Sequence, residues 1–319
     1  MEHREQRFKY VFGPVRSRRL GKSLGVNHVP YKTCTYSCVY CQLGRTINQV
    51  IERTAFYDPS EIVNEVREFL AKWSSEVDCI TLVPDGEPLL DERVGLLIAG
   101  IKEITDKPVA VLSNGSLLYV EEARESLLGA DIVSVKVDAV SEETWRRINR
   151  PHRELSLSRV LEGMLEFSRS FKGRLLTETM LVEGLNTKLD EVELVAEYIK
   201  ALNPWRSYIS IPVRPPAELF VKPPRPEVLV AVYNVFAEKL GSSKVELLNL
   251  PEPPEFKVHG EPEAWLLNLV SVHPLRLSYA LRTLRDVVED PEQFVNKLVE
   301  EKKVKVVEFS GEYFIVRAY

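Results

Sequence analysis

The amino-acid sequence predicts an α/β protein in which a parallel sheet is followed by a smaller α+β module. Between residues 59 and 213, short runs of β-branched residues alternate with amphipathic helical segments. Repeated βα units of this kind are typical of a parallel sheet with right-handed crossovers. Two proline-rich stretches follow, and the pattern then changes to two helices and a hairpin.

The expected elements follow one another in a regular order. A helix over 59–73 is indicated by apolar residues at helical spacing, with Ser60 as its expected N-cap. Short apolar runs bounded by polar loops predict the strands, and longer periodic segments predict the helices. The later elements are strand 79–83, helix 92–104, strand 109–112, helix 121–128, strand 132–137, helix 156–171, strand 174–181, helix 189–201 and strand 208–213.

The C-terminal residues form a separate expected module. The division is 1–250 for the sheet region with a basic N-terminal extension, 251–262 for a proline-rich linker and 263–319 for the module. Helices near 274–286 and 291–303 and a hairpin over 304–316, turning at Ser310-Gly311, make the module winged-helix-like. It carries eight Lys and Arg against nine Asp and Glu. This balance favours a docking or lid role over DNA binding.

Composition and charge exclude several classes of protein. Of the 319 residues, 45% are apolar and 28% are charged, which is typical of a globular chain and not of a disordered one. No apolar run is long enough to predict a membrane span, and the first ten residues lack the apolar region of a secretory signal. The expected location is therefore the cytoplasm. The net charge of −5 excludes a uniformly basic nucleic-acid binder but not a local basic patch.

Three of the four cysteines lie in one short segment. Cys34, Cys38 and Cys41 have C-x3-C-x2-C spacing, which favours a metal site over disulfides in a cytoplasmic chain. Three thiolates suit three irons of a [4Fe–4S] cluster and leave the fourth iron open to substrate. The alternative is a zinc ion whose fourth ligand is a histidine such as His28. Cys79 stands in an apolar run and is expected in the core.

This cysteine segment resembles the signature of the radical S-adenosylmethionine (AdoMet) superfamily, C-x3-C-x-aromatic-C, with Tyr40 in the aromatic position. The wider match is to an archaeal and bacterial group similar to wyosine-tRNA synthases. It covers about residues 10–215 and is carried by FGPVRSRRLGKSLGV, YCQLGRT and VPDGEPLLD. Wyosine synthases hold a second cluster on additional cysteines, which are not present here. The resemblance implies a partial (β/α)6 barrel, a [4Fe–4S] cluster on the three cysteines and AdoMet, with ligands at the C-terminal ends of the strands.

The resemblance also implies which residues contact AdoMet. Gly86 and Glu87 match the Gly-Gly-Glu motif that binds the amino group of AdoMet, with Asp85 in place of the first glycine. Asn114, in a Ser-Asn-Gly turn, is expected to donate hydrogen bonds in this pocket, although a plain Asx turn is the alternative. The other implied contacts are Tyr40 and Ile211 near the adenine, Glu178 at the ribose hydroxyls, and Ser134.

Polar residues on the expected strand 132–137 and directly after it favour a substrate site. In VSVKVDA, Ser134, Lys136 and Asp138 have the same parity and therefore share one face, which should point into the barrel. Lys136 and Asp138 are the candidate catalytic residues. Lys136 is suited to hold an anion or, with a lowered pKa, to form a Schiff base. A structural Lys–Asp pair is the alternative.

Basic residues gather near the expected mouth of the barrel. Residues 1–50 hold nine Lys and Arg and two acids, and the segment RRINRPHR at 146–153 is a second basic group. Clustered arginine side chains suit phosphate groups of a nucleotide or RNA. The alternative is that part of this charge offsets the anionic cluster and the AdoMet carboxylate. The candidate substrate residues are Arg18, Arg19, Arg150, Arg153 and Arg214.

The resemblance implies an iron–sulfur enzyme, an oxidoreductase or transferase. A reductase such as ferredoxin or flavodoxin would supply one electron, AdoMet would break into methionine and a 5′-deoxyadenosyl radical, and the radical would take hydrogen from a substrate. The basic segments favour a tRNA or phosphorylated nucleoside as that substrate. The alternatives are activation or modification of a protein docked by the C-terminal module, and a non-enzymatic regulator that binds metal or nucleic acid.

Overall fold

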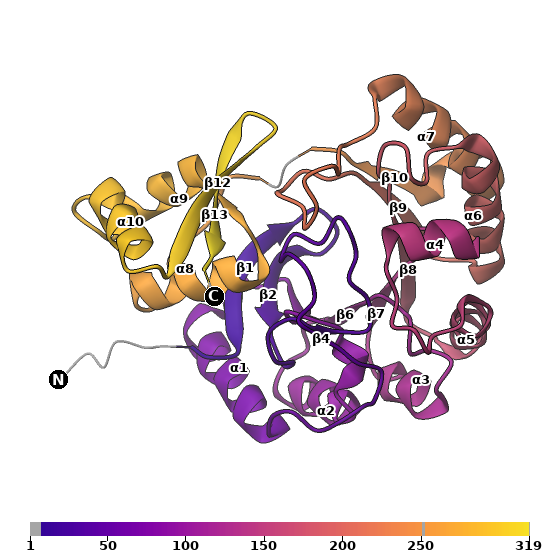
Figure 1. Ribbon diagram of the computed structural model, residues 1–319. Helices are drawn as coiled ribbons and strands as arrows, with labels where there is room; N and C mark the ends of the chain where they lie inside the picture. The colour runs from indigo at the N-terminus through magenta and orange to yellow at the C-terminus, as the bar shows by residue number, and fades with distance from the viewer. Residues whose placement is uncertain (1–7, 251–252, 319) are drawn as a thin grey trace.

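Eight strands form one curled sheet, and helices cover its outer face (Figure 1). The computed structural model describes residues 8–250 and 253–318. The strand order is β1-β2-β5-β6-β7-β8-β9-β10, and neighbouring strands from β2 to β10 are parallel. This sheet is the expected partial barrel, extended by an antiparallel strand at one edge and a parallel strand at the other.

Successive residues of each strand point to opposite sides of the sheet. On β5, Ile80 and Leu82 pack into the core under the helices, while Thr81 faces the inside of the barrel. The same alternation places Val133 and Val135 of β7 in that core. The sheet strands are β1 (Val11–Ser17), β2 (Gly21–Val26), β5 (Cys79–Leu82), β6 (Val109–Ser113), β7 (Ile132–Lys136), β8 (Arg174–Met180), β9 (Arg206–Ser210) and β10 (Val245–Leu248).

Helices form an arc around the sheet in Figure 1. Helix α1 shows why, because Ile62, Val66 and Phe69 recur at helical spacing and are buried against the sheet. Its N-cap is Asp58, whose side chain accepts from the Ser60 amide, so the expected cap at Ser60 was wrong by two residues. The helices of the barrel are α1 (Pro59–Trp73), α2 (Val94–Ile104), α3 (Glu121–Leu127), α4 (Glu142–Ile148), α5 (Leu157–Ser170), α6 (Leu189–Leu202) and α7 (Pro226–Leu240).

The basic N-terminal segment is part of the sheet. Strands β1 and β2 form an antiparallel hairpin, and β2 is the first parallel strand of the barrel. The hairpin turn carries Leu20 into an inner cluster with Cys79, which is buried as expected. The turn therefore fills the end of the barrel where the parallel strands begin. This placement matters for the arginines of the turn.

The C-terminal module contains three helices and a three-stranded antiparallel sheet, in the order β11-β13-β12. The hairpin lies where the sequence places it, whereas the expected helix 274–286 is only helical over Leu277–Leu284, after strand β11, and the expected helix 291–303 ends at Glu300. Helix α8, by contrast, begins at Pro262, inside the expected linker, because proline is well tolerated at the first helical position. The elements are α8 (Pro262–Val272), β11 (Leu275–Arg276), α9 (Leu277–Leu284), α10 (Pro291–Glu300), β12 (Val304–Phe309) and β13 (Glu312–Arg317).

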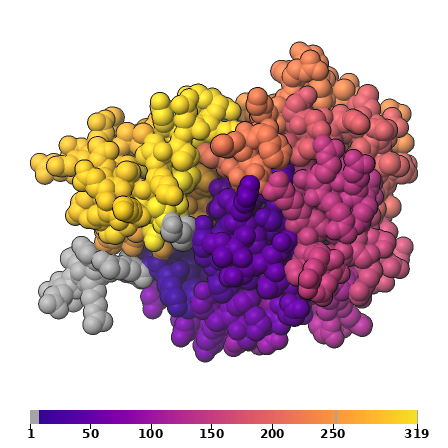
Figure 2. Space-filling view, in the orientation of Figure 1, coloured from indigo at the N-terminus to yellow at the C-terminus, as the bar shows by residue number. Residues whose placement is uncertain are grey.

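The module packs directly against the barrel edge. Phe12 of β1 lies in the module's own core with Trp265, Leu266 and Leu269 of α8. Figure 2 shows the yellow module in close contact with the barrel on this face. Among the described residues, no helix combines the length and apolar character that a membrane span requires.

Several elements were not anticipated. No element was predicted for the segments that form helices α4 and α7 and strand β10, and α7 begins at Pro226, where proline is well tolerated. Strand β9 ends at Ser210 instead of 213, because Pro212 cannot donate to the ladder. Residues 211–225 therefore form a long loop, in which Glu218 N donates to Val39 O of the cysteine segment at 3.0 Å.

Candidate functional site

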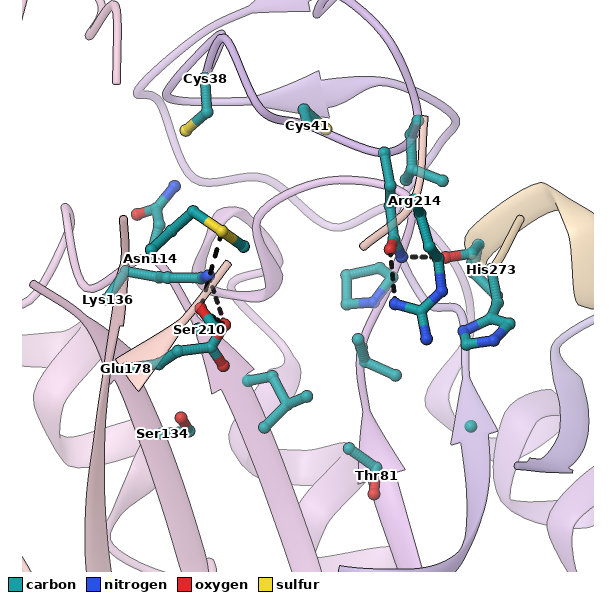
Figure 3. A pocket seen from close by; sticks show the side chains of 18 of the residues that line it. Cys38, Cys41, Thr81, Asn114, Ser134, Lys136, Glu178, Ser210, Arg214 and His273 are labelled. Atoms are coloured by element: carbon teal, nitrogen blue, oxygen red, sulfur yellow. Dashed lines mark hydrogen bonds and ion pairs between the residues drawn. The ribbon is translucent and has the colours of Figure 1, made fainter. Parts of the chain in front are cut away.

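A cavity of about 390 Å³ lies inside the barrel, between the cysteine segment and the β1–β2 turn (Figure 3). The C-terminal ends of the parallel strands contribute one wall, and the loops that follow them contribute another. The residues of the predicted site that line it are Arg18, Arg19, Cys34, Cys38, Tyr40, Cys41, Gly86, Glu87, Asn114, Ser134, Lys136, Glu178, Ile211 and Arg214.

The three cysteines share this cavity. Cys34 ends the short strand β3 (Thr33–Cys34), which pairs with β4 (Asn48–Gln49), and the loop between them carries Cys38 and Cys41. Two backbone turns shape the loop, because Cys41 N donates to Cys38 O and Gly44 N donates to Cys41 O. All three thiols are free and partly exposed. The segment from β3 to β4 is called the cluster loop below.

Burial makes the thiols of Cys34 and Cys38 hard to ionise without a cation. It raises the pKa of Cys38 to about 12, with the Asp138 carboxylate adding to the effect. The pKa of Cys34 is also raised well above its ordinary value, first by burial and then by Glu87. A metal that binds here must displace these protons, as metals do at thiolate sites.

The donor set fits an iron–sulfur cluster better than one zinc ion. Among the described residues, no three His, Cys, Asp or Glu side chains are placed to hold a single metal ion. A [4Fe–4S] cluster does not require such convergence, because each thiolate bonds a different iron. His28, the proposed fourth zinc ligand, is fully buried and does not line the cavity. Burial lowers its pKa to about 4, so it is neutral.

The loop after β5 supplies acceptors to the cavity. Glu87 accepts from Leu89 N at 3.0 Å, Ser113 Oγ at 2.6 Å and Asn114 N at 2.8 Å. Burial nevertheless raises its pKa to about 7. Asp85 lines the cavity beside it, and its buried Oδ1 accepts no hydrogen bond from the described residues. Burial also raises the pKa of Asp85 to about 7. An unpartnered buried carboxylate oxygen suits a cationic ligand group such as an ammonium.

Asn114 has two roles in the structure. Its Oδ1 accepts from Ser116 N at 2.8 Å, which is the Asx turn that was the alternative interpretation. Its Nδ2 donates to Thr35 Oγ1 at 2.8 Å and lies 3.7 Å from Cys34 Sγ. The turn therefore presents the amide to the cluster loop.

A carboxylate lies between two cations at the inner wall. Lys136 Nζ is 2.7 Å from Glu178 Oε1, and Ser210 Oγ donates to the same oxygen at 3.0 Å. Arg19 makes an ion pair with Glu178 Oε2. Burial lowers the pKa of Lys136. Burial, together with the neighbouring charges of Arg18 and Arg214, lowers the pKa of Arg19 to about 10.

Asp138 occupies a different position from the one expected. It follows the end of β7 and does not line the cavity. Tyr40 Oη donates to Asp138 Oδ2, Asn149 Nδ2 donates to the same oxygen at 2.7 Å, and Met180 N donates to Oδ1 at 2.8 Å. Its hydrogen-bonding capacity is therefore used within the protein. The direct catalytic role expected for Asp138 stays a prediction, and in this structure its carboxylate accepts from Tyr40 and Asn149.

Two of the predicted substrate arginines lie outside the cavity. Arg150 makes an ion pair with Glu218 in the loop after β9, and Glu218 also binds Arg45 of the cluster loop. Arg153 is strongly exposed, with Glu154 3.7 Å away. These side chains belong to the outer rim of the barrel. The charge pattern of residues 146–153 does not show which of its side chains face inward.

The C-terminal module completes the cavity wall. Val272, the last residue of α8, and His273, its C-cap, line it. Gln42, next to Cys41, donates from Nε2 to Val272 O at 2.9 Å and accepts at Oε1 from Arg214 at 3.0 Å (Figure 3). Sequence reasoning assigned no role to Gln42, Asn149 or His273. Gln42 stands in the motif YCQLGRT and Asn149 in the basic segment RRINRPHR, but attention went to the cysteines and the arginines. The only signal for His273 was its position near the end of an element.

Comparisons with known proteins agree with this geometry. Residues 28–199 match the model of the Radical SAM superfamily. A UPF0026 protein of Methanocaldococcus jannaschii is 42% identical over 308 residues, which cover 96% of this chain and 95% of that protein. A UPF0026 protein of Synechocystis is 37% identical over 209 residues, covering 65% of this chain and 77% of that protein.

Solved structures share the fold at low identity. The structure of TYW1 with a lysine–pyruvate adduct bound has a TM-score of 0.52 and 16% identity, covering 68% of this chain and 73% of that chain. A radical SAM methyltransferase from Sphaerobacter thermophilus has a TM-score of 0.53 and 13% identity, covering 71% of this chain and 66% of that chain.

Proposed function

The chain belongs to the radical SAM superfamily, and from that membership we propose that it modifies a tRNA or a phosphorylated nucleoside by hydrogen abstraction. Members of the superfamily bind a [4Fe–4S] cluster and AdoMet. When bound, this pair supplies a 5′-deoxyadenosyl radical after one-electron reduction. The residues of the cavity divide into those that would hold the two cofactors and those that would receive the substrate.

The cofactor residues lie on one side of the cavity. Cys34, Cys38 and Cys41 would hold the cluster. Asp85 and Glu87 would accept from the amino group of AdoMet, because Asp85 Oδ1 is buried with no partner among the described residues. By the same proposal, the loops that follow β5, β6 and β9 surround AdoMet. The further contacts are Tyr40, Gly86, Asn114, Ser134, Glu178 and Ile211.

The proposed substrate class rests on the excess of cationic side chains around Glu178, inside the cavity. Arg19 and Lys136 share the single carboxylate of Glu178, and the charges of Arg18 and Arg214 act on Arg19 from the same cavity. Packing like charges together is unfavourable unless an anion joins them. A phosphate group offers the charge and the oxygen acceptors that guanidinium groups bind best. Lys136, held by Glu178, would act as an anion ligand, and we favour this role over a Schiff base.

Two more distant relatives support the same substrate class. A dual-specificity RNA methyltransferase, RlmN, of Bradyrhizobium diazoefficiens is 25% identical over 197 residues, covering 54% of this chain and 48% of that protein. A probable GTP 3′,8-cyclase of Methanococcus aeolicus is 26% identical over 175 residues. One acts on RNA and the other on a nucleotide, by their names.

The test is 5′-deoxyadenosine formation by anaerobically reconstituted protein, with ferredoxin or flavodoxin as reductant. Bulk tRNA, a set of nucleoside phosphates and buffer alone form the three arms. The proposal predicts a burst of product with tRNA or with one nucleotide. The same slow rate in all three arms would contradict the substrate class and leave the radical chemistry standing.

A second candidate function is the modification of a protein partner. It is favoured by the position of Val272 and His273, because the C-terminal module reaches the cavity and could present a bound partner to it. Deleting the module would expose Phe12, so point variants are the better test. Val306→Lys and Tyr313→Lys alter the exposed surface of the β12–β13 hairpin. Loss of turnover on a protein substrate, with AdoMet cleavage retained, would support this function.

A further inference from the structure

Each cysteine of the cluster loop has a side-chain N–H donor near its sulfur. Two of the donors are neutral amides and the third is an ammonium. The two amides come from distant segments of the chain, whereas Lys32 directly precedes β3. The pairs are Cys34 with Asn114 (3.7 Å from Nδ2 to Sγ), Cys38 with Asn149 (3.5 Å from Nδ2 to Sγ) and Cys41 with Lys32 (3.7 Å from Nζ to Sγ).

Other contacts hold the two amides in place. Asn114 is fixed by Thr35 and by its Asx turn, and Asn149, at the end of α4, is fixed by the Asp138 carboxylate. These contacts exist independently of any cofactor. The amides are therefore oriented toward the sulfurs before a cluster binds, which is how residues around a metal site orient and tune its ligands.

Lys32 is the unusual member of the set. Only 2% of the residue is exposed, and its backbone has a φ of 55°. Its Nζ donates to the Gly44 carbonyl oxygen in the cluster loop. Within residues 8–250 and 253–318, no ion pair includes Lys32. Lys32 N donates to Asp85 O at 3.1 Å, and the charge of Lys32 opposes the rise that burial causes in the pKa of the Asp85 carboxyl. A buried ammonium with no carboxylate in hydrogen-bond contact is costly unless an anion binds beside it.

We propose that Lys32 is a positioning residue that sets the reduction potential of the cluster bound by this loop. A cluster on three thiolates is anionic, and its reduced form carries one more negative charge. A fixed positive charge near Cys41 stabilises the reduced form more than the oxidised form and so raises the potential. Hydrogen bonds to the sulfurs act in the same direction. The inference rests on the proposed function, because it requires that a cluster binds.

The experiment compares three variants in the reconstituted full-length protein. Lys32→Met keeps the length of the side chain and removes its charge, while Lys32→Arg keeps the charge. Lys107→Met is the matched control, because Lys107 also donates to a backbone carbonyl, that of Val77 at 2.6 Å, at the opposite end of the sheet. The readouts are iron and sulfide per chain and the midpoint potential from an EPR-monitored redox titration without AdoMet.

The expected result is wild-type iron content in all variants and a lower potential in Lys32→Met alone. The ratio of reduced to oxidised cluster at a given potential should fall at least tenfold, which is about 59 mV for one electron. Wild-type potential in a fully loaded Lys32→Met protein would overturn the inference. Failure of the wild-type protein to bind iron would instead overturn the proposed function.

A second neutral variant is included in case the Lys32→Met protein binds too little iron for its potential to be measured. Lys32→Gln keeps an N–H donor without the charge, and the same fall in its potential supports the inference. If both neutral variants lose iron while Lys32→Arg loads fully, the charge is required for assembly, and its assignment to the potential is wrong.

Discussion

The carbonyl oxygen of Thr33 lies against the α-carbon of Gly86, where a β-carbon on residue 86 would be 1.8 Å from that oxygen. Two hydrogen bonds flank this contact. Glu87 N donates to Thr33 O at 3.1 Å, and Lys32 N donates to Asp85 O at 3.1 Å. The cluster loop and the loop that supplies Asp85 and Glu87 are therefore joined along their backbones, so the proposed sites for the two cofactors form one unit.

Gly86→Ala should separate these loops. The overlap is with backbone, so the chain must shift, and we expect a loss of stability of more than about 3 kcal/mol together with reduced iron loading. Gly184→Ala is the control, because Gly184 has a positive φ but open space around it, and it should cost about 1 kcal/mol. Thermal unfolding and iron content measure both variants. Equal behaviour of the two would show that the contact is not required.

The four cysteines should divide into three ligands and one core residue. Cys34→Ala, Cys38→Ala or Cys41→Ala should abolish the charge-transfer absorbance of the reconstituted protein, because each would bind one iron. Cys79→Ala should load fully and cost about 1 kcal/mol, because Cys79 is a small buried side chain beside Leu20. Loss of iron from the Cys79 variant would contradict this division.

Asp85→Asn should stabilise the apo-protein in a pH-dependent way. Burial raises the pKa of Asp85 from 3.8 to about 7, so folding is favoured by the protonated form. Below pH 4, burial of Asp85 does not lower the free energy of unfolding. The free energy of unfolding falls as the pH rises from 4 to 7, and the whole loss is present above pH 7. The variant should gain about 2–4 kcal/mol at pH 8 and almost nothing at pH 4.

The same substitution should weaken AdoMet binding at pH 8, because Asp85 Oδ1 would no longer present a charge to the amino group. Urea unfolding at the two pH values and calorimetric titration with AdoMet measure the two effects. A gain in stability that is independent of pH would show that burial of charge at Asp85 is not its cause.

Much of this site follows from the sequence because its parts are local motifs. The spacing of Cys34, Cys38 and Cys41 and the segment that contains Glu87 each keep their chemistry in a few adjacent residues. The parity of Ser134 and Lys136 on β7 correctly places both in the cavity. Parity failed at Asp138 because the strand ends at Lys136, and beyond its end alternation no longer fixes which way a side chain points.

Other features depend on long-range packing and leave no local signal. Arg19 was expected at the mouth because it precedes the cysteines in sequence. The hairpin turn instead carries it into the barrel to meet Glu178, which is 159 residues away. Lys32 looks like an ordinary loop lysine, and only the folded chain brings Gly44 and Cys41 around its ammonium. The contact of Gln42 with Val272 likewise depends on how the C-terminal module packs.

Arg153→Gln should weaken RNA binding evenly across sequences if the outer rim contacts the RNA backbone. Arg153 is strongly exposed, so it is available to a phosphate and contributes little to the fold. The slope of log K against log salt should fall by about 0.7 to 0.9 for one lost contact. Binding measured from 50 to 200 mM salt gives this slope, and Arg159→Gln, on the outer helix α5, is the control. An unchanged slope would place the RNA elsewhere.

Gln42→Ala should loosen the closure of the cavity. The side chain links Arg214 to the Val272 carbonyl, so its loss frees the C-terminal module on that side while the packing of α8 on Phe12 remains. We expect more 5′-deoxyadenosine per modified substrate, with a change in melting temperature of only a few degrees. An unchanged ratio would show that this link does not affect coupling.

The most direct test of the central claim is reductive cleavage of AdoMet by the anaerobically reconstituted protein. Wild-type protein with dithionite should form 5′-deoxyadenosine and methionine in equal amounts, Cys79→Ala should match it, and Cys34→Ala should form neither product. Wild-type protein that holds iron and sulfide but yields no 5′-deoxyadenosine with reductant and tRNA would contradict the assignment of this cavity to radical AdoMet chemistry.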